Sequence, residues 1–330
     1  MPANLTPQYL KAEQEYRRAS TPEEELRCLE WMLRELPKHK GTDKLQAELR
    51  QKISRVKKEL QQTRPGTRRG STLKITRQGA GRAVIIGGPN AGKSQLLASL
   101  TRATPEVAPY PFTTREPQPG MMPWQDVMVQ LVDTPPITKD FLDPNLHGLI
   151  RGADLVLLVA DMGNDEGLDA LLEVVERLQQ TKSRLARSSY LDEEDVGLSY
   201  TQSLLVLNKK DLPGFAERVA LLDEFFPLDL PRYEISALTG EGLEELREAI
   251  YRSLDVVRVY TKAPWQKEPD RDRPFTIRRG GTLIEVAEMI HKDLARNLKF
   301  ARVWGKRVHD ATVVKGDYVP EDGDVVEFHE

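Results

Sequence analysis

A glycine-rich segment follows an apolar run near residue 85 and ends in lysine and serine. The apolar run is Ala83-Val84-Ile85-Ile86, and residues 87–94 match the pattern G-x-x-x-x-G-K-[ST]. A strand that turns into a helix through such a loop directs its backbone N–H groups at the phosphates of a nucleotide, and the helix dipole adds to the attraction. We expect Lys93 to contact the β- and γ-phosphates and the Ser94 hydroxyl to bind Mg²⁺. An ordinary glycine-rich turn is the structural alternative.

A second motif, Asn208-Lys209-Lys210-Asp211, follows another apolar run over residues 203–207. An aspartate carboxylate can accept hydrogen bonds from both the N1–H and the exocyclic amine of guanine, whereas the adenine edge has no such pair of donors. Asp211 is therefore predicted to select guanine. We expect Asn208 to hold the base-binding loops and the stem of Lys209 to lie against the base plane.

A third segment, Ser236-Ala237-Leu238, follows a short predicted strand over residues 233–235. A backbone N–H in this segment is expected to donate to guanine O6. The residues predicted to bind the nucleotide come from all three segments: Gly88, Pro89, Asn90, Ala91, Gly92, Lys93, Ser94, Gln95, Asn208, Lys209, Asp211, Ser236, Ala237 and Leu238.

The remaining metal ligands are expected between the first two motifs. Asp133 follows a predicted strand over residues 127–132 and is expected to hold Mg²⁺ through a water. A loop that contains proline and shows no helix or strand period includes Thr113 and Thr114. We expect Thr114, with Thr113 as the alternative, to bind Mg²⁺ when the third phosphate is present, which would order the loop. A plain pair of surface threonines is the structural alternative.

The segment Asp133-Thr134-Pro135-Pro136 departs from the pattern D-x-x-G, because proline stands where glycine is expected. A glycine there would donate its backbone N–H to the γ-phosphate, whereas proline has no N–H and a fixed φ. Two interpretations are open. Either a neighbouring amide contacts the γ-phosphate in place of the glycine, or the coupling between this switch segment and nucleotide hydrolysis is altered.

Together the motifs resemble the Obg and DRG branch of the translation-factor-related GTPases: the phosphate loop reads G-G-P-N-A-G-K-S, the first switch reads Y-P-F-T-T and the guanine loop reads N-K-K-D. Residues 37–42, which precede a long basic helix, are similar to the same family. The resemblance implies a GTPase that hydrolyses GTP to GDP and phosphate. Between Asp161 and Asn208 the chain has too few residues for the α/β insertion of eukaryotic and archaeal DRG proteins, so we expect a shorter relative.

The resemblance also implies catalytic roles for Lys93, Thr114 and Asn90. In related GTPases an asparagine at the Asn90 position helps to hold K⁺ against the phosphates, so activation by K⁺ is a hypothesis. The alternative is that Asn90 only tolerates the unusual backbone angles of the loop. Ile137 stands after Pro136, where other GTPases have a glutamine that orients the attacking water.

Residues 273–330 resemble a TGS domain, which is a small β-grasp module. The matching segments are Arg273-Pro274-Phe275-Thr276-Ile277, Val303-Trp304-Gly305-Lys306 and Glu321-Asp322-Gly323-Asp324-Val325-Val326-Glu327. TGS modules occur in proteins that work with RNA and the ribosome, so the resemblance implies a ribosomal or RNA partner in addition to GTP and GDP. Phe300 and Trp304 either stack on bases or fill the core of the module, and we favour the core.

These motifs require an α/β fold with a mostly parallel sheet. Strands are predicted near residues 83, 127, 155, 204 and 233, with helices between them. We therefore predict a P-loop GTPase domain over residues 82–258. A helical hairpin in an N-terminal region (1–63) and a basic linker (64–81) should precede it, and a TGS domain (272–330) should follow.

Composition limits the partners and the compartment. The chain has 330 residues, a net charge of -3 and a single cysteine, Cys28, and no apolar run approaches the length that crosses a bilayer. We expect a cytoplasmic protein without a membrane partner and without DNA specificity. Residues 60–105 contain Lys and Arg but no Asp or Glu, so this stretch either contacts a phosphate backbone or is a solvated linker. The alternative function is a nucleotide-stabilised RNA- or ribosome-binding scaffold with weak or uncoupled hydrolysis.

Overall fold

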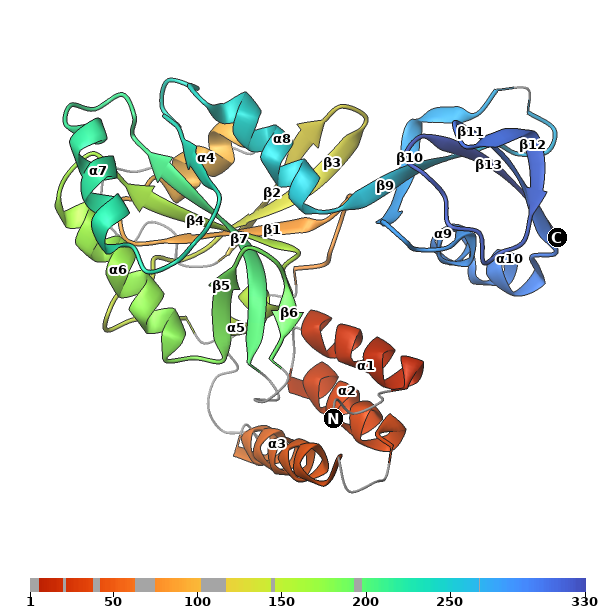
Figure 1. Ribbon diagram of the computed structural model, residues 1–330, viewed down its shortest axis with the longest axis horizontal. Helices are drawn as coiled ribbons and strands as arrows, with labels where there is room; N and C mark the ends of the chain where they lie inside the picture. The colour runs from red at the N-terminus through yellow and green to blue at the C-terminus, as the bar shows by residue number, and fades with distance from the viewer. Residues whose placement is uncertain are drawn as a thin grey trace.

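The computed structural model describes residues 6–19, 22–37, 42–62, 75–101, 117–143, 146–192, 198–266 and 268–330. Three units follow one another along the chain, and Figure 1 shows the N-terminal helices on one side of the central sheet and a smaller C-terminal sheet beyond β9. In the described part of the chain, no helix is both long and apolar enough to span a bilayer.

The central sheet has the strand order β2-β3-β1-β4-β7-β5, with β6 and β8 also paired to β7. Its strands are β1 Arg82–Gly87, β2 Gln118–Trp124, β3 Val127–Asp133, β4 Leu155–Asp161, β5 Ser183–Ala186, β6 Tyr190–Leu191, β7 Ser199–Asn208 and β8 Arg232–Glu234. Only β2 and β6 run antiparallel to their neighbours. β1 and β4 are buried along their whole length, as expected for parallel strands covered on both faces. The predicted α/β class with a mostly parallel sheet is confirmed.

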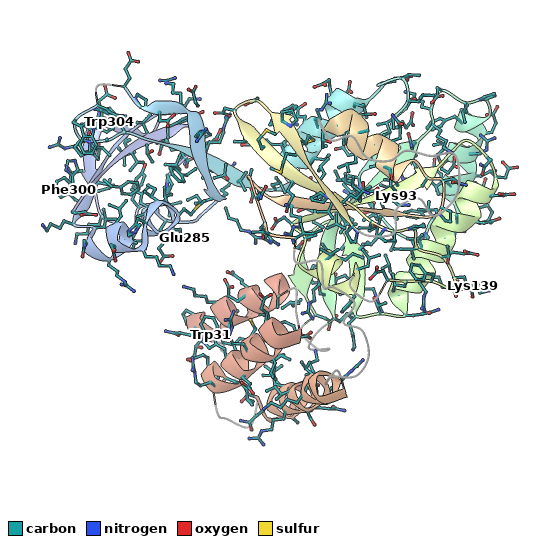
Figure 2. The ribbon with its side chains drawn as sticks, turned by 180° about the vertical axis from the view of Figure 1, so that it is seen from behind. Trp31, Lys93, Lys139, Glu285, Phe300 and Trp304 are labelled. Carbon is teal, nitrogen blue, oxygen red and sulfur yellow. The ribbon has the colours of Figure 1, made fainter. Side chains whose placement is uncertain are left out.

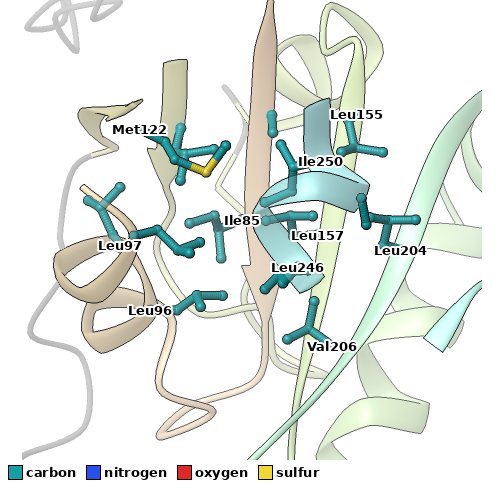
Figure 3. Close-up of a cluster of buried hydrophobic side chains, with 14 of the residues drawn as sticks. Ile85, Leu96, Leu97, Met122, Leu155, Leu157, Leu204, Val206, Leu246 and Ile250 are labelled. Atoms are coloured by element: carbon teal, nitrogen blue, oxygen red, sulfur yellow. The ribbon is translucent and has the colours of Figure 1, made fainter. Parts of the chain in front are cut away.

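Helices cover the two faces of this sheet because successive strand residues point to opposite sides. Ala83 and Ile85 pack against α4 (Lys93–Leu100) and α8 (Leu243–Ser253), and Figure 3 shows Ile85 among Leu96, Leu157 and Leu246. On the other face, the core that contains Val84 and Ile86 is covered by three helices: α5 Leu146–Arg151, α6 Glu166–Gln179 and α7 Phe215–Phe225. The register pairs Ile85 with Asp133, and Asp161 with Asn208, so the carboxyl ends of four strands meet at one edge.

The described residues of the N-terminal unit form three helices, α1 Pro7–Arg18, α2 Pro22–Glu35 and α3 Asp43–Gln62. The expected hairpin corresponds to α2 and α3, and α1 completes a bundle in which Tyr9 and Tyr16 are buried against the other helices. The sequence analysis did not predict α1, because its buried face consists of tyrosine and alanine rather than leucine.

The C-terminal unit is a sheet of order β10-β9-β13-β11-β12 with one short helix packed on it and a second short helix beside the first. Its elements are β9 Val256–Thr261, β10 Asp270–Arg278, α9 Leu283–Ile290, α10 Lys292–Asn297, β11 Phe300–Gly305, β12 Val308–Val314 and β13 Asp324–His329. The expected boundaries placed residues 256–258 in the central domain and started the TGS domain at residue 272. Because β9 pairs with β10 and β13, we place the start of the C-terminal unit at β9.

The end of the expected basic linker folds onto the central domain. Gly79 pairs with Val129 at a φ of +70°, and a Cβ on this glycine would lie 2.1 Å from the Met128 carbonyl oxygen. Arg77 forms an ion pair with Asp154 at 2.9 Å. Arg82 is buried, and its Nε donates to Gln130 at 2.8 Å. These arginines are therefore used inside the chain, which corrects the idea that the whole basic stretch contacts a phosphate backbone; residues 63–74 and 102–116 lie outside the described residues.

Candidate functional site

The glycine-rich loop joins β1 to α4 at the edge where the strand ends meet. Lys93 opens α4, and its Nζ donates to the carbonyl oxygens of Gly88 at 2.8 Å and Gly87 at 3.3 Å. Figure 2 shows Lys93 where this helix meets the sheet. Burial lowers the pKa of Lys93 to about 8, although the nearby Asp133 opposes the shift. A buried ammonium held only by carbonyl oxygens is suited to take up an anionic group.

The backbone of the loop requires glycine at one position for two reasons. Gly92 has a φ of +87°, and a Cβ on it would lie 2.3 Å from Nδ2 of Asn208. Asn90 also lies in the left-handed region, with a φ of +57°, and its side chain is exposed. Asparagine tolerates this conformation better than most residues, so the backbone interpretation agrees with the structure, and binding of K⁺ stays a hypothesis.

A hydroxyl and a carboxylate meet beside the start of α4. Ser94 Oγ donates to Asp133 Oδ2 at 2.5 Å, and Asp133 is fully buried at the end of β3. The next residue, Thr134, donates from Oγ1 to the Ile85 carbonyl oxygen at 2.7 Å, which fixes this segment against β1. Hard oxygen donors of this kind suit Mg²⁺, which uses few protein ligands and completes its shell with phosphates and water. The described residues contain no group of three or more His, Cys, Asp or Glu side chains that could hold a metal ion.

The structure brings the guanine motif and the glycine-rich loop into contact. Asn208 Nδ2 donates to the Ala91 carbonyl oxygen at 2.9 Å, and its Oδ1 accepts the N–H of Ala237 at 2.9 Å. Asp211 Oδ1 accepts the Ser236 hydroxyl at 2.5 Å. One side-chain amide therefore joins all three segments that the sequence analysis selected. Leu238 is 75% exposed at the rim of this site.

Two residues that the sequence analysis did not select support the site. Asp161, at the end of β4, pairs with Lys209 Nζ at 2.6 Å and accepts the N–H of Gly163 at 2.8 Å. Ser99 donates to the Ala237 carbonyl oxygen at 2.7 Å, and Gln95, one turn earlier in α4, donates to Ser99 at 3.3 Å. Asp161 could have been found from the sequence, because it is an acidic residue at the end of an apolar run, as Asp133 is. No sequence pattern marked Ser99.

Residues 135–138, which follow Asp133 and Thr134, offer no free amide to a phosphate. Pro135 and Pro136 have none, the N–H of Ile137 donates to the Gly87 carbonyl oxygen at 3.1 Å, and that of Thr138 donates to Phe141 at 3.0 Å. Ile137 is buried in the core beside Val84 and Ile86. Its side chain therefore fills the core, which differs from the expected position of a water-orienting residue. Thr113 and Thr114 lie outside the described residues.

Family models match two parts of this chain. Residues 82–193 match the family model described as 50S ribosome-binding GTPase, and residues 257–330 match the TGS domain model. An uncharacterized GTP-binding protein of Methanocaldococcus jannaschii is 30% identical over 360 residues, with 92% of each chain covered. Because that alignment is longer than the 330 residues of this chain, the archaeal relative has segments that this chain lacks.

Two further relatives are similar to this chain in sequence, and one solved structure is similar in fold. Developmentally-regulated G-protein 2 of Arabidopsis thaliana is 27% identical, with 86% of this chain and 84% of the relative covered. GTPase Obg of Oceanobacillus iheyensis is 30% identical, with 74% of this chain and 60% of the relative covered. The structure of the Schizosaccharomyces pombe YchF GTPase has a TM-score of 0.50 at 15% identity and covers 77% of this chain and 99% of its own. That likeness concerns the fold alone.

Proposed function

Because this chain belongs to the DRG/Obg family of GTP-binding proteins, we propose that it is a Mg²⁺-dependent GTPase that cycles on and off a ribosomal or RNA partner. GTP binding and GTPase activity are the common properties of this family. The observation that carries the proposal is the amide of Asn208 in the guanine loop, which contacts the glycine-rich loop at Ala91 and the segment 236–238 at Ala237. A phosphate cradle and a guanine-selective carboxylate thus belong to one site.

Each predicted residue has a definite task in this proposal. The amides of Gly88 to Ser94 and the Lys93 ammonium bind the phosphates, and Asp211 accepts the N1–H and 2-amino hydrogens of guanine in place of the Ser236 hydroxyl. Asp161 holds the ammonium of Lys209, so the stem of this lysine is fixed beside the base. Holding the nucleotide in one orientation is the main contribution that a protein makes to phosphoryl transfer.

Ser94 and Asp133 would hold Mg²⁺, with Thr114 as the proposed third protein ligand. When bound, the ion neutralises charge on the β- and γ-phosphate oxygens. Asn90 is the proposed residue for K⁺, and the test is direct. We expect GTP turnover to be higher in K⁺ than in Na⁺ buffer, and equal turnover in both would remove K⁺ from the proposal.

Two features support a ribosomal or RNA partner. The matching family model is described as ribosome-binding, and the C-terminal unit matches the TGS model. Basic residues of that unit, including Arg278, Arg279 and Arg307, also form ion pairs within the chain. Phe300 stacks on His329, and Lys262 lies 4.6 Å from the ring centre of Trp304, so these aromatic rings have partners inside the unit. Because these basic and aromatic side chains already have partners inside the chain, they do not by themselves indicate where a partner binds. Binding to ribosomes or RNA should therefore be tested with the whole chain.

The test uses purified protein stripped of nucleotide. Calorimetry in magnesium buffer should detect binding of both GDP and GTP, and Asp211→Asn should lose the preference for guanine because an amide cannot accept two hydrogen bonds from the base edge. Phosphate release should rise when ribosomes are added. Absence of heat with either nucleotide would contradict the site itself, whereas turnover unchanged by ribosomes would contradict only the partner.

A specific observation favours a second candidate function. Residues 135–138 have no amide available for a γ-phosphate, which fits a nucleotide-stabilised scaffold with weak or uncoupled hydrolysis. The Pro136→Gly variant restores a backbone donor and conformational freedom. Raised turnover in Pro136→Gly, but not in the matched Pro135→Gly variant, would favour the scaffold. Ribosome-stimulated turnover in the wild-type chain would favour the cycling enzyme.

A further inference from the structure

A small cavity lies where the three units meet, away from the nucleotide site. Its volume is about 30 Å³, and its polar lining comes from every unit: Gln14, Arg77, Arg151, Asp154, Ser189 and Arg278. Gln14 belongs to α1 of the bundle, and Arg278 ends β10 of the C-terminal unit. The volume exceeds the roughly 10–15 Å³ that a single water requires, so it accommodates one small group and no nucleoside.

The lining carries excess positive charge. Three guanidinium groups surround the cavity, and Asp154 is the carboxylate between two of them, at 2.9 Å from Arg77 and 3.0 Å from Arg278. Arg151 pairs with Glu25 of α2 at 3.1 Å. Three cations therefore face two carboxylates. The buried Arg82 shares the same carboxylate, since its backbone N–H donates to Asp154 at 2.9 Å, and burial, followed by the charge of Arg77, lowers its pKa to about 10 although Asp154 opposes the shift.

Hydrogen-bond donors also exceed acceptors at this junction. Arg151 is buried, and its Nη1 donates to the Tyr16 hydroxyl at 3.2 Å and to Glu25, but its buried Nε–H has no partner in the structure. Leaving a charged donor unpaired in the interior is costly. The Ser189 hydroxyl accepts the N–H of Gln202 at 2.8 Å and keeps its own hydrogen to donate. With Asp154 as its one carboxylate, the lining has more charged donors than negatively charged acceptors.

We propose that this cavity binds a small inorganic oxyanion with the chemistry of phosphate. The anion accepts hydrogen bonds from Arg151 and Ser189 and lies among guanidinium groups from the central domain, the segment before β1 and the C-terminal unit. Charge-assisted hydrogen bonds from guanidinium to oxyanion are among the strongest in proteins. Binding therefore stabilises the observed arrangement of the bundle and the C-terminal unit around the central domain.

The test must separate this cavity from the glycine-rich loop, which also binds phosphate. The full chain is first saturated with GDP in magnesium buffer, and calorimetry then follows inorganic phosphate, with chloride at equal ionic strength as the control. We expect saturable phosphate binding. Arg278→Gln should weaken it about tenfold or more, because one charged hydrogen bond is lost. Arg279→Gln is the matched control: Arg279 is adjacent, equally exposed and ion-paired with Asp255, but does not line the cavity, so binding should be unchanged.

A second variant and a second readout complete the test. Arg151→Lys keeps the positive charge but removes the unpaired Nε–H, and it should weaken phosphate binding as well. Phosphate should also raise hydrogen-exchange protection in α1 and β10 of the wild-type chain, and not in Arg278→Gln. If Arg151→Lys fails to fold, Arg278→Gln still decides, since its side chain is half exposed. Phosphate heats equal to those of chloride, or unchanged binding in Arg278→Gln, would mean that the cavity holds water only.

Discussion

At the residue scale, the predicted nucleotide site depends on a few side chains and on one glycine that lies directly against the Asn208 amide. Asn208 approaches the glycine-rich loop so closely that only glycine fits at position 92. Lys93 is buried, and its ammonium donates to two carbonyl oxygens of the glycine-rich loop. The first feature gives a prediction that separates a steric clash from backbone strain. The second gives a prediction that assigns proton uptake to one lysine.

Gly92→Ala should destabilise the fold and weaken GDP binding. The substitution adds a left-handed alanine, which costs roughly 1–2 kcal/mol, and a clash with the Asn208 amide. Gly240→Ala is the matched control, because Gly240 has a φ of +89° but nothing within 4 Å of an added Cβ. The difference in unfolding free energy between the two variants, measured by denaturant titration, reports the clash alone. Equal losses would show that Asn208 moves away at little cost.

GDP binding should take up protons near pH 8. Burial lowers the pKa of Lys93 to about 8, and phosphates beside the ammonium should raise it again. Affinity should therefore fall about fourfold between pH 7 and pH 8.5, as follows from linkage. Calorimetry in buffers of different ionisation enthalpy measures the uptake. Proton uptake should persist when GDP binds to Lys210→Gln and should be absent when GDP binds, more weakly, to Lys93→Met. Uptake in both variants would assign the proton to another group.

At the element scale, α5 connects the segment after Asp133 to the N-terminal bundle. This short helix begins at Leu146 and ends at Arg151, whose guanidinium lies 4.5 Å from the ring centre of Tyr16 in α1 and pairs with Glu25 in α2. A conformational change in the segment that follows Asp133 could therefore be transmitted to the bundle through this short helix and its Arg151 contacts. His147 on the same helix contacts Ser183 at 2.9 Å and gives this connection a measurable pH dependence.

Stability should decrease as the pH falls from 7 to 5, in part because of His147. Burial lowers the pKa of His147 to about 4, and the charge of Arg151 adds to the shift while Glu25 opposes it. Because the folded-state pKa lies below the unfolded value of 6.5, the contribution is complete above pH 6.5 and is lost as the pH drops toward 4. The loss by pH 5 is about 2 kcal/mol.

The measurement is the unfolding free energy at pH 7 and pH 5 for the wild type and His147→Gln. The variant should lose about 2 kcal/mol less across this range. His291→Gln is the control, because His291 is well exposed at the start of α10 and should behave as the wild type. A pH dependence unchanged in His147→Gln would show that the imidazole is already solvated in the folded chain.

At the scale of the whole molecule, both flanking units contact parts of the central domain that connect to the nucleotide site. The C-terminal unit holds the turn between β2 and β3: Arg258 donates to Asp126 at 2.8 Å and pairs with Asp322 at 2.7 Å, and the Tyr260 hydroxyl also donates to Asp126. β3 ends in Asp133, so this contact lies one strand away from the predicted metal ligand. The arrangement of units is therefore held by polar contacts at two separate places.

Asp126→Asn should loosen the C-terminal unit without unfolding it. The carboxylate accepts hydrogen bonds from both Arg258 and Tyr260, and replacing it removes charge-assisted bonds worth roughly 1.5–3 kcal/mol. We expect faster hydrogen exchange at β9 and in the β2–β3 turn, and a larger radius in X-ray scattering. Glu321→Gln is the control, since its partner Arg307 lies in the same unit. An unchanged radius in Asp126→Asn would mean that other contacts hold the units together.

The sequence by itself determined the local chemistry of this protein. The glycine-rich loop follows β1 directly, so its backbone geometry depends on a few adjacent residues, and apolar runs before Asp133 and Asn208 predicted strands whose carboxyl ends meet at one edge. The resemblance to Obg and DRG proteins followed from these same motifs, and the family comparison confirms it.

Only the tertiary structure decided which distant residues meet. The pairing of Asp161 with Lys209, the burial of Ile137, the membership of β9 in the second sheet and the cluster of arginines at the junction all join segments far apart in the chain. Hydrophobic periodicity predicts that a residue is buried but not what it is buried against, and an ion pair leaves no spacing in the sequence. Such contacts are set by packing of whole elements, because the energy of any one of them is small compared with that of the core.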